Sequence, residues 1–450
     1  MSKERSPTIF DKVVAYLSPE KAVMRERAKI QLQFLNKGYS HHGANENKKA
    51  MRGWDSESGS PNEDINNNLA TLRSRSRDLY MGGANIATGA IKTTRTNAIG
   101  YGLTLKPSVD NEFLRMSEEE AETWKQTVVR EFEYYANSVN CDRFRLNNFY
   151  ELQQLAFLSM LLSGDVFVML PYKARQGFAY DLRIQLIEGD RVRTPEEQAY
   201  NANVSQGVET QDGEVTAYYI SHKHPGTADY DDKYTKVPAF GDTGRRNILH
   251  LMESERPDQT RGIPILAPVI ESLRQMGRYT VAELTAAVVS GLFTVFVYEE
   301  MPQLDLGNSM STDEQIDPDN PYTYELGNGS IVRLRQGEKI ETAAPGRPNV
   351  AFDSFMSSMT KHVGAAVEIP HELLSKEFNA SYSASRAALL EAWKMFRMRR
   401  KWFAGDFCQP IYEEWLTEAV AKGRIHAPGF FDDPIIKAAY CKAEWHGCFL

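Results

Sequence analysis

Two sets of side chains in this sequence could do chemistry, by holding a metal or by transferring protons. His222 and His224 are two residues apart, so they share one face of a predicted strand, where their imidazole nitrogens could bind a metal ion. No third ligand is close in sequence, and an exposed strand beside a loop is the simpler interpretation. Asp165 and Asp190 lie at the ends of predicted strands and are the first candidates for acid–base catalysis, although structural roles explain both more simply.

A cluster of positive charge lies in the longest predicted helix, at Arg397, Arg399, Arg400 and Lys401. Such a cluster could contact DNA or an acidic partner. It could equally form a solvated helix face that nearby glutamates balance. The sequence alone leaves these two interpretations open.

The short motifs typical of enzymes are absent from the sequence. It contains no GxxxxGK(S/T), no GxSxG, no HExxH and no GxGxxG after a predicted strand. Its cysteines, Cys141, Cys408, Cys441 and Cys448, form no CxxC pair, so we expect free, mostly buried thiols. We therefore expect no catalytic residues, no cofactor and no bound metal.

The composition is that of an ordinary globular protein, with 42% hydrophobic and 25% charged residues over 450 positions. This length is enough for two or three domains with their own cores. The longest apolar stretch, 282–298, is interrupted by Glu283 and other polar residues, and a membrane helix needs about 20 mostly apolar residues. The N-terminus lacks the apolar core of a signal peptide. We expect synthesis in the cytoplasm and no membrane association.

Helical periodicity predicts most of the elements that must position these side chains. Ser117, with Glu120 three residues later, has the pattern of a capping box, and Pro410 should kink the last and strongest helix. A helix that begins near Pro264 should reach about 40 Å. The expected helices are 21–35, 69–97 with a break at Gly82-Gly83, 117–137, 147–162, 264–291, 353–367 and 383–421.

Short β-rich runs between the helices predict a mixed α and β region in the middle of the chain. The runs 166–171 and 182–188 should pair with each other. The other expected strands are 103–106, 216–222, 247–252, 293–298, 330–335 and 338–342. Polar or irregular segments are expected over 36–68, 225–246, 302–329 and 373–381.

Five segments then form a pattern that resembles one protein family. They are 69–79 (LATLRSRSRDL), 99–103 (IGYGL), 185–192 (QLIEGDRV), 258–264 (DQTRGIP), and 369–393 with its Ile369-Pro370, SYSASRA and EAW runs. In this order and spacing they are similar to the lambda family of tailed-bacteriophage portal proteins, from about residue 54 to residue 445. The resemblance implies an α+β, helix-rich fold with a wing, two stem helices, a clip and a long kinked helix.

The family's architecture also implies boundaries along this chain. They are a flexible N-terminal arm (1–65), a wing (66–261), stem helix 1 (262–292), a clip (293–350), stem helix 2 (351–369), a tunnel loop (370–383), a long kinked wing helix (384–423) and the start of a crown (424–450). Family members usually continue further at the C-terminus, so we expect the crown to be truncated. Glu368 stands where the family often has Gly, so the turn before Ile369-Pro370 should differ.

The resemblance implies a passive conduit for DNA. About twelve copies would close into a ring at one vertex of the virion capsid, assembled in the host cytoplasm. Double-stranded DNA would pass through during packaging and ejection without sequence specificity. The net charge of −8 disfavours a tight phosphate binder but suits a channel in which DNA must slide. The implied partners are the terminase large subunit, head-completion or connector proteins, and the major capsid or scaffold protein.

The tunnel loop implied by the family would bring Lys376, Asn379, Ser381 and Tyr382 close to the DNA. Two other classes of function remain open from the residues alone. A non-viral helical scaffold or interaction protein would be a monomer or dimer and would form no ring. A hydrolase would need a concave pocket with clustered acids of raised pKa.

Overall fold

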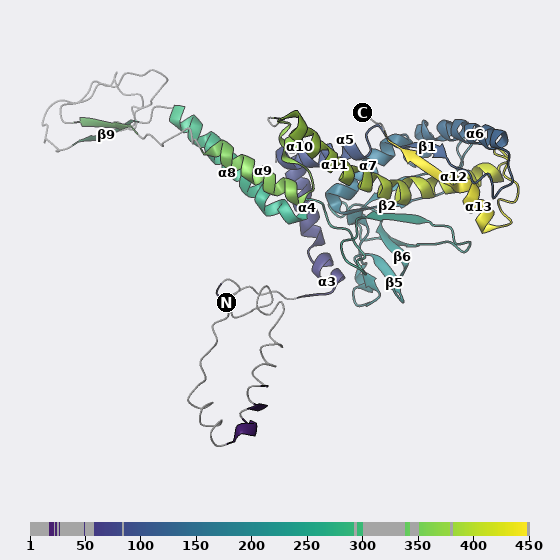
Figure 1. The fold of residues 1–450 in the computed structure, drawn as a ribbon, viewed down its shortest axis with the longest axis horizontal. Helices are drawn as coiled ribbons and strands as arrows, with labels where there is room; N and C mark the ends of the chain where they lie inside the picture. Colours follow the sequence, from purple (N-terminus) through teal and green to yellow (C-terminus); the bar gives the residue numbers. More distant parts are fainter. Residues whose placement is uncertain are drawn as a thin grey trace. The chain divides into compact units, whose positions relative to one another are not determined.

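The computed structural model describes residues 58–82, 85–291, 295–299, 338–342, 351–378 and 381–447, with a few positions between 18 and 49. The chain divides into two compact units, Met1–Gly59 and Ser60–Leu450, and the second contains nearly all of the described residues. Most of the expected helix over 21–35 and of the loop that follows it lies outside the described residues. The second unit is a helix-rich α+β structure (Figure 1), as the sequence predicts.

The folded unit begins earlier than the expected arm boundary. Ser60 caps a short helix, α3 (Pro61–Asn66), and exchanges hydrogen bonds with Glu63 in a complete capping box. This corrects the expectation of a loop through residue 68, because Asn, Pro and Ser here start a helix instead of forming an irregular segment. Helices α4 (Leu69–Met81) and α5 (Asn85–Ala98) follow, with the expected break near Gly82.

An aromatic core forms between α6 (Glu118–Ala136), α7 (Phe149–Ser163) and α12 (Gln409–Ala421). The capping box of Ser117 and Glu120 starts α6 as predicted. The Phe132 ring lies at the centre of the aromatic core and meets the Trp415 ring edge-on, at 4.9 Å between ring centroids. Strand β1 (Thr104–Pro107) pairs antiparallel with β11 (Ala443–His446), which brings the C-terminal part of the described chain onto this core.

Two small antiparallel sheets make up the middle of the chain. The first has the order β3-β2-β8, from β2 (Asp165–Met169), β3 (Gln185–Glu188) and β8 (Ile248–Met252). The expected pairing of β2 with β3 is confirmed. The second has the order β4-β5-β6-β7, from β4 (Val204–Ser205), β5 (Val208–Gln211), β6 (Glu214–Ser221) and β7 (Tyr234–Pro238).

Strand β7 lies within 225–246, which the sequence analysis predicts to be a loop. That prediction is wrong for Tyr234–Pro238, where β7 pairs along β6 from Tyr234 with Ser221 to Pro238 with Ala217. The strand is mostly exposed and ends in proline, so it carries almost no hydrophobic alternation. Proline at the end of an edge strand is compatible with a ladder whose other side faces solvent.

Two long helices, α8 (Ile270–Gly291) and α9 (Phe352–Ala366), lie side by side and are joined through the β-ribbon of β9 (Val295–Glu299) and β10 (Glu338–Thr342) (Figure 1). The Tyr279 ring of α8 contacts the rings of Phe352 and Phe355 on α9, at 5.4 and 5.0 Å. Pro264 does not begin α8 directly, because a 3-10 turn at Ala267–Val269 comes first. The helix is therefore about 33 Å long at 1.5 Å per residue, shorter than expected. The expected strand 330–335 and loop 302–329 lie outside the described residues.

The last long helical segment changes its hydrogen bonding in the middle. Helix α11 (Tyr382–Phe403) leads into one π-helical stretch, Ala404–Cys408, and then into α12. The Gln409 N–H donates to the Ala404 carbonyl, five residues back, and Pro410 follows with no N–H to donate. The sequence predicts a kink at Pro410, and the structure has a π-bulge that begins six residues before it. Helix α10 (His371–Ser375) precedes α11, and α13 (Pro434–Cys441) follows α12.

A search of the described residues for a helix both long and apolar enough to cross a membrane finds none.

Candidate functional site

A buried ion network connects the three segments that enclose the base of α8. The Asp165 carboxylate, at the start of β2, accepts hydrogen bonds from Arg73 Nη2 at 2.6 Å and from Arg261 Nε at 2.6 Å. The Gly262 N–H also points to it, at 3.2 Å. All three charged side chains are nearly inaccessible to solvent. The network joins α4 to β2 and to the segment that leads into α8.

The charge state of Asp165 is fixed by its neighbours. Burial opposes ionisation, but the guanidinium groups of Arg261 and Arg73 outweigh it and hold the pKa of Asp165 well below its usual range. A carboxylate in this state neither donates nor accepts a catalytic proton near neutral pH. Asp165 is therefore a structural anion, as the simpler interpretation of the sequence holds.

Close backbone packing accompanies this network. A Cβ on Gly164, which has φ +88°, would lie 2.4 Å from the Gly262 carbonyl oxygen, and a Cβ on Gly262 would lie 2.0 Å from the Gly164 oxygen. Two glycines thus allow the chain before β2 and the chain before α8 to touch.

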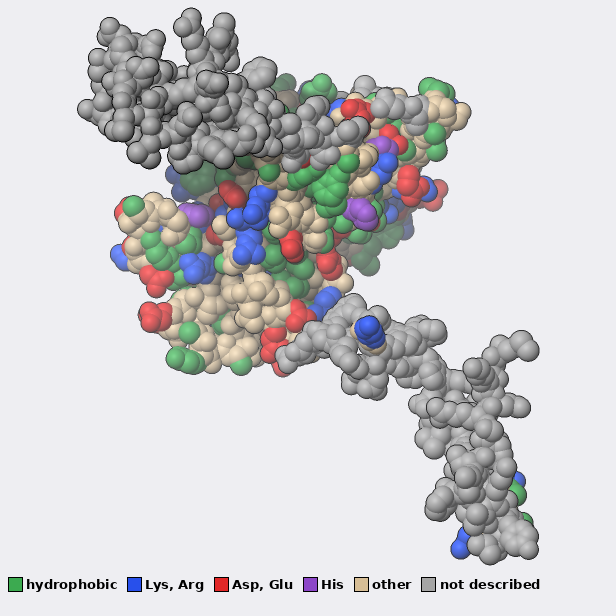
Figure 2. Space-filling view, turned by 90° about the vertical axis from the view of Figure 1, so that its left-hand side faces the viewer, with side chains coloured by type: hydrophobic (Ala, Val, Ile, Leu, Met, Phe, Trp, Pro, Cys, Tyr) green, Lys and Arg blue, Asp and Glu red, His purple; other side chains and the backbone are tan. Residues whose placement is uncertain are grey.

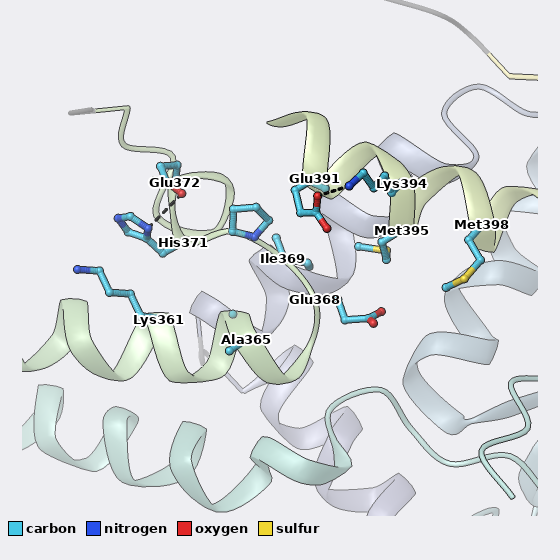
Figure 3. Close-up of a pocket in the computed structure, with 13 residues that line it drawn as sticks. Lys361, Ala365, Glu368, Ile369, His371, Glu372, Glu391, Lys394, Met395 and Met398 are labelled. Atoms are coloured by element: carbon cyan, nitrogen blue, oxygen red, sulfur yellow. Dashed lines mark hydrogen bonds and ion pairs between the residues drawn. The ribbon is translucent and has the colours of Figure 1, made fainter. Parts of the chain in front are cut away.

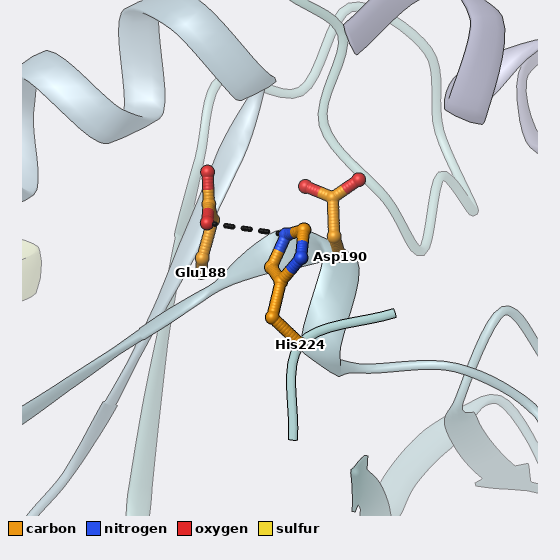
Figure 4. Close-up of side chains that lie close together, drawn as sticks. All are labelled: Glu188, Asp190 and His224. Atoms are coloured by element: carbon orange, nitrogen blue, oxygen red, sulfur yellow. Dashed lines mark ion pairs between the residues drawn. The ribbon is translucent and has the colours of Figure 1, made fainter. Parts of the chain in front are cut away.

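The possible metal site indicated by the histidines takes a different form in the structure. His224 lies in a cluster with Glu188 and Asp190, which are more than thirty positions earlier in the sequence (Figure 4). His222 lies outside this cluster, and its ring forms a hydrogen bond with Thr235 Oγ1 at 2.8 Å. Both carboxylates already pair with Arg77, which is 2.9 Å from Glu188 Oε1. His224 Nδ1 accepts the Gly226 N–H at 3.0 Å, so Nε2 carries the proton of the neutral ring and lies 3.5 Å from Glu188. The guanidinium occupies the position of a cation, and these residues do not favour a metal.

The residues that the family resemblance predicts to lie near DNA belong to α10, the start of α11 and the segment between them. Lys376 ends α10 with a left-handed backbone, φ +61°, and its Nζ lies 3.3 Å from Thr93 Oγ1 on α5. Ser381 caps α11 by accepting the Ala384 N–H, and Tyr382 is 80% exposed. Asn379 lies outside the described residues. The exposed Tyr382 and Lys376 are therefore available for contact with a partner.

A hollow of about 550 Å³ lies at the base of this segment, between α9, α10 and α11 (Figure 3). Its apolar wall comes from Ala365, Ile369 and Met395. Charged groups on the rim pair locally: His371 Nδ1 is 3.1 Å from Glu372, and Lys394 Nζ is 2.6 Å from Glu391. Figure 3 shows the Met395 and Met398 side chains of α11 facing this hollow.

The basic cluster of α11 separates into two pairs. Arg399 and Arg400 are buried: Arg399 lies 3.4 Å from Glu253 and 3.3 Å from Glu368, and Arg400 Nε donates to the Ala98 carbonyl at 2.7 Å. Their hydrogen bonds hold α11 against α5 and the turn at Glu368. Arg397 and Lys401 are exposed and remain available to a partner.

Acids of raised pKa, which the hydrolase alternative requires, are scarce in the described part of the chain. Burial raises the pKa of Asp406, with Arg246 opposing, and Asp406 is the one described carboxyl group shifted upward. Asp190 is paired with Arg77. On the face drawn in Figure 2, acidic and basic side chains are interspersed and do not gather by sign.

Comparison with known proteins identifies the family. The sequence model of the lambda family of phage portal proteins matches residues 47–400. The chain belongs to the lambda family of phage portal proteins. Portal protein B of Escherichia phage lambda is 22% identical over 431 residues, which cover 91% of this chain and 80% of that protein. The portal protein of Escherichia phage N15 is 22% identical over 420 residues, covering 88% and 78%.

Among solved structures, similar folds come from gene transfer agent particles. One is a chain in the neck of a native particle computed with C12 symmetry, with 10% identity and a TM-score of 0.45 over 74% of this chain and 81% of that chain. Another, from the virion of a native particle, has 10% identity and a TM-score of 0.46 over 82% and 93%.

The ion network joins three of the segments that resemble the portal family and that are distant in sequence. Arg73 and Arg77 belong to LATLRSRSRDL, Glu188 and Asp190 to QLIEGDRV, and Arg261 to DQTRGIP. The structure brings these side chains together around Asp165. Local sequence patterns do not predict this network, and the available signal is the helical spacing of Arg73 and Arg77.

We expect Asp165→Asn to destabilise the protein by about 3–5 kcal/mol, because the substitution leaves two buried guanidinium groups without their anion. Urea unfolding followed by circular dichroism measures this change. Asp212→Asn, in the exposed turn between β5 and β6, is the matched control and should stay within about 0.5 kcal/mol of the parent. A loss below about 1 kcal/mol for Asp165→Asn would show that the network does not hold the fold.

We expect the stability of the protein to depend on pH through His250. Its burial lowers the pKa of its imidazole, although Asp165 at 3.4 Å raises it. Below pH of about 6.5 the unfolded state binds a proton that the folded state does not, so stability falls as the pH drops toward the folded pKa. We expect His250→Gln to flatten this part of the curve, measured by urea unfolding between pH 7 and pH 5. The same change at exposed His362 should leave the slope as it is, and an unchanged slope in His250→Gln would contradict the assignment.

Proposed function

We propose that this chain is the subunit of a portal ring at one vertex of a phage capsid, a passive conduit through which the genome is packaged and ejected. The match of the portal family over residues 47–400 is the observation that carries this proposal. Family members named as portal proteins in phages lambda and N15 support it. The subunit would act in the virion after assembly in the host cytoplasm.

Ring closure requires each subunit to present two different surfaces to its two neighbours. Helix α8 has a surface suited to this. Val281, Leu284 and Val288 are spaced by three and four residues and are 63%, 65% and 58% exposed. An apolar stripe on a helix normally packs against another element. We propose that α8 and α9 are the two stem helices and that this stripe packs on the neighbouring subunit.

The remaining parts follow the family's order. In the proposal, the wing spans 66–261, the clip 293–350, the tunnel loop 370–383, the kinked wing helix 384–423 and the first part of the crown 424–450. The clip would dock the terminase large subunit and later the head-completion or connector proteins, and the wing would meet capsid or scaffold protein. The ATPase of the motor would supply the work, and the portal would supply a channel.

A net negative charge suits a channel through which DNA slides better than it suits a protein that binds DNA tightly. Strong phosphate contacts would have to break for every step of DNA movement, whereas a net charge of −8 avoids them. Contacts would then be few and confined to the tunnel loop. Lys376 is the described cation in this segment, with Asn379, Ser381 and Tyr382 as polar neighbours in sequence.

Native mass spectrometry with negative-stain imaging tests the ring. We expect closed rings of about twelve subunits with a central hole wide enough for a DNA duplex. Leu284→Glu should reduce ring formation without unfolding the subunit, because its side chain is largely exposed in the isolated chain. Gln211→Glu, at an exposed position of β5, is the control and should still form rings. Stable monomers or dimers from the parent chain would favour the non-viral scaffold alternative.

A packaging assay tests the tunnel loop. We expect Lys376→Ala with Asn379→Ala to lower the length of DNA retained per particle, because the loop then loses its cation and an amide. Thr93→Val is a matched control, since it removes the 3.3 Å contact of Lys376 and keeps the charge. Unchanged DNA retention in the double variant would contradict this contact. An equal loss in Thr93→Val would instead assign Lys376 a structural role.

A further inference from the structure

Another pocket, of about 490 Å³, is lined by different residues of α11 from the hollow between α9, α10 and α11, and it lies where the π-bulge meets β11. Its wall includes Arg397, Lys401, Gly405, Lys442, Ala443 and Trp445. The pocket joins residues from α11, from the π-bulge and from the segment after α13, so it exists only in the folded chain.

Three cations on this pocket lack acidic partners. Arg397, Lys401 and Lys442 are exposed, and none forms an ion pair within the part of the chain that the structure describes. Other lysines of this region are paired, such as Lys394 with Glu391 at 2.6 Å. The one acid on the wall, Glu444, already lies 3.6 Å from Lys106 and 3.2 Å from His446. The pocket is therefore a local positive site on a negatively charged protein.

The floor of the pocket is apolar. Trp445 is half-buried, and its ring packs against Phe132 and Tyr412 at 6.0 and 6.2 Å between centroids. The indole N–H already donates to Gln409 Oε1 at 3.3 Å, so the exposed part of the ring offers a hydrophobic surface. Ala404 and Ala443 extend this surface.

We propose that this pocket docks a short acidic segment of another protein, with one apolar side chain placed against Trp445 and with Asp or Glu residues on either side. The flanking carboxylates would reach Arg397, Lys401 and Lys442. Exposed ion pairs are individually weak, so the apolar side chain provides the anchor and the charges provide selectivity and speed of association.

A protein segment fits this site better than DNA. A duplex would meet the three cations with its phosphates, but its backbone has no apolar group to fill the hollow above Trp445. The three cations also come from two separate parts of the chain around one hollow, which suits a compact peptide. The proposal goes beyond the portal function and does not depend on ring formation.

A random 12-residue displayed peptide library is the probe, selected on the full chain and counter-selected on a plugged variant. Gly405→Leu serves as the plug, because Gly405 lines the pocket and a Cβ on this helical glycine meets no atom within 4 Å. Gly405→Ala is the matched control that leaves the pocket open. We expect enriched peptides with Leu, Phe or Trp flanked by Asp and Glu.

Fluorescence anisotropy of the strongest peptide then measures each element of the site. We expect at least ten-fold weaker binding for Gly405→Leu and for Arg397→Glu with Lys401→Glu, and weaker binding as salt rises. Lys394→Glu, a charge reversal on the same helix outside the pocket, should change affinity by less than two-fold, as should Gly405→Ala. Circular dichroism checks that every variant is folded.

Three results would overturn the proposal. The first is a selection that enriches no peptides, or that enriches neutral or basic ones. The second is equal binding of the enriched peptide to Gly405→Leu. The third is a 20-base-pair duplex that binds more tightly than the peptide and loses affinity in the charge-reversal variant, which would assign the three cations to DNA.

Discussion

One buried carboxylate, Asp165, holds together parts of the chain that are about ninety residues apart on either side. Isolated buried charges are very costly, so two guanidinium groups and one carboxylate can enter the interior only together. Arg73 and Arg261 are nearly fully buried and both bind Asp165. This requirement fixes α4 and the segment before α8 to the start of β2.

The same constraint bears on mechanics under the portal proposal. Helix α8 begins nine residues after Arg261, beyond a 3-10 turn, so the helix base is attached to the sheet by charge and by the contact of Gly164 with Gly262. Breaking a buried pair is costly because an unpaired charge is left behind. Under that proposal, a load on the stem would reach the wing through a rigid connection while an external motor drives DNA through the channel.

In the basic cluster of α11, ion pairs and hydrogen bonds within the chain distinguish the arginines that hold the fold from the cations that can bind a partner. Arg399 and Arg400 were expected to share a surface with Arg397 and Lys401, but they are buried and bind Glu253, Glu368 and backbone carbonyls. A helix places residues two apart on different faces, so a run of basic residues cannot all face one partner. Arg397 and Lys401 remain exposed, and they belong to the pocket beside Trp445, in which the apolar floor is as important as the positive charge.

The sequence by itself determined the family, the capping box of Ser117 and Glu120 and most helices, because these depend on local spacing and on short motifs. It predicted the pair of β2 with β3 through hydrophobic runs, and it missed β7, whose exposed side chains carry no such pattern. Only the tertiary structure decided that Asp165 meets Arg73 and Arg261, and that Lys442 and Trp445 complete a pocket with α11. Each of these contacts joins residues far apart in the chain, and local periodicity contains no information about which distant charges are buried together.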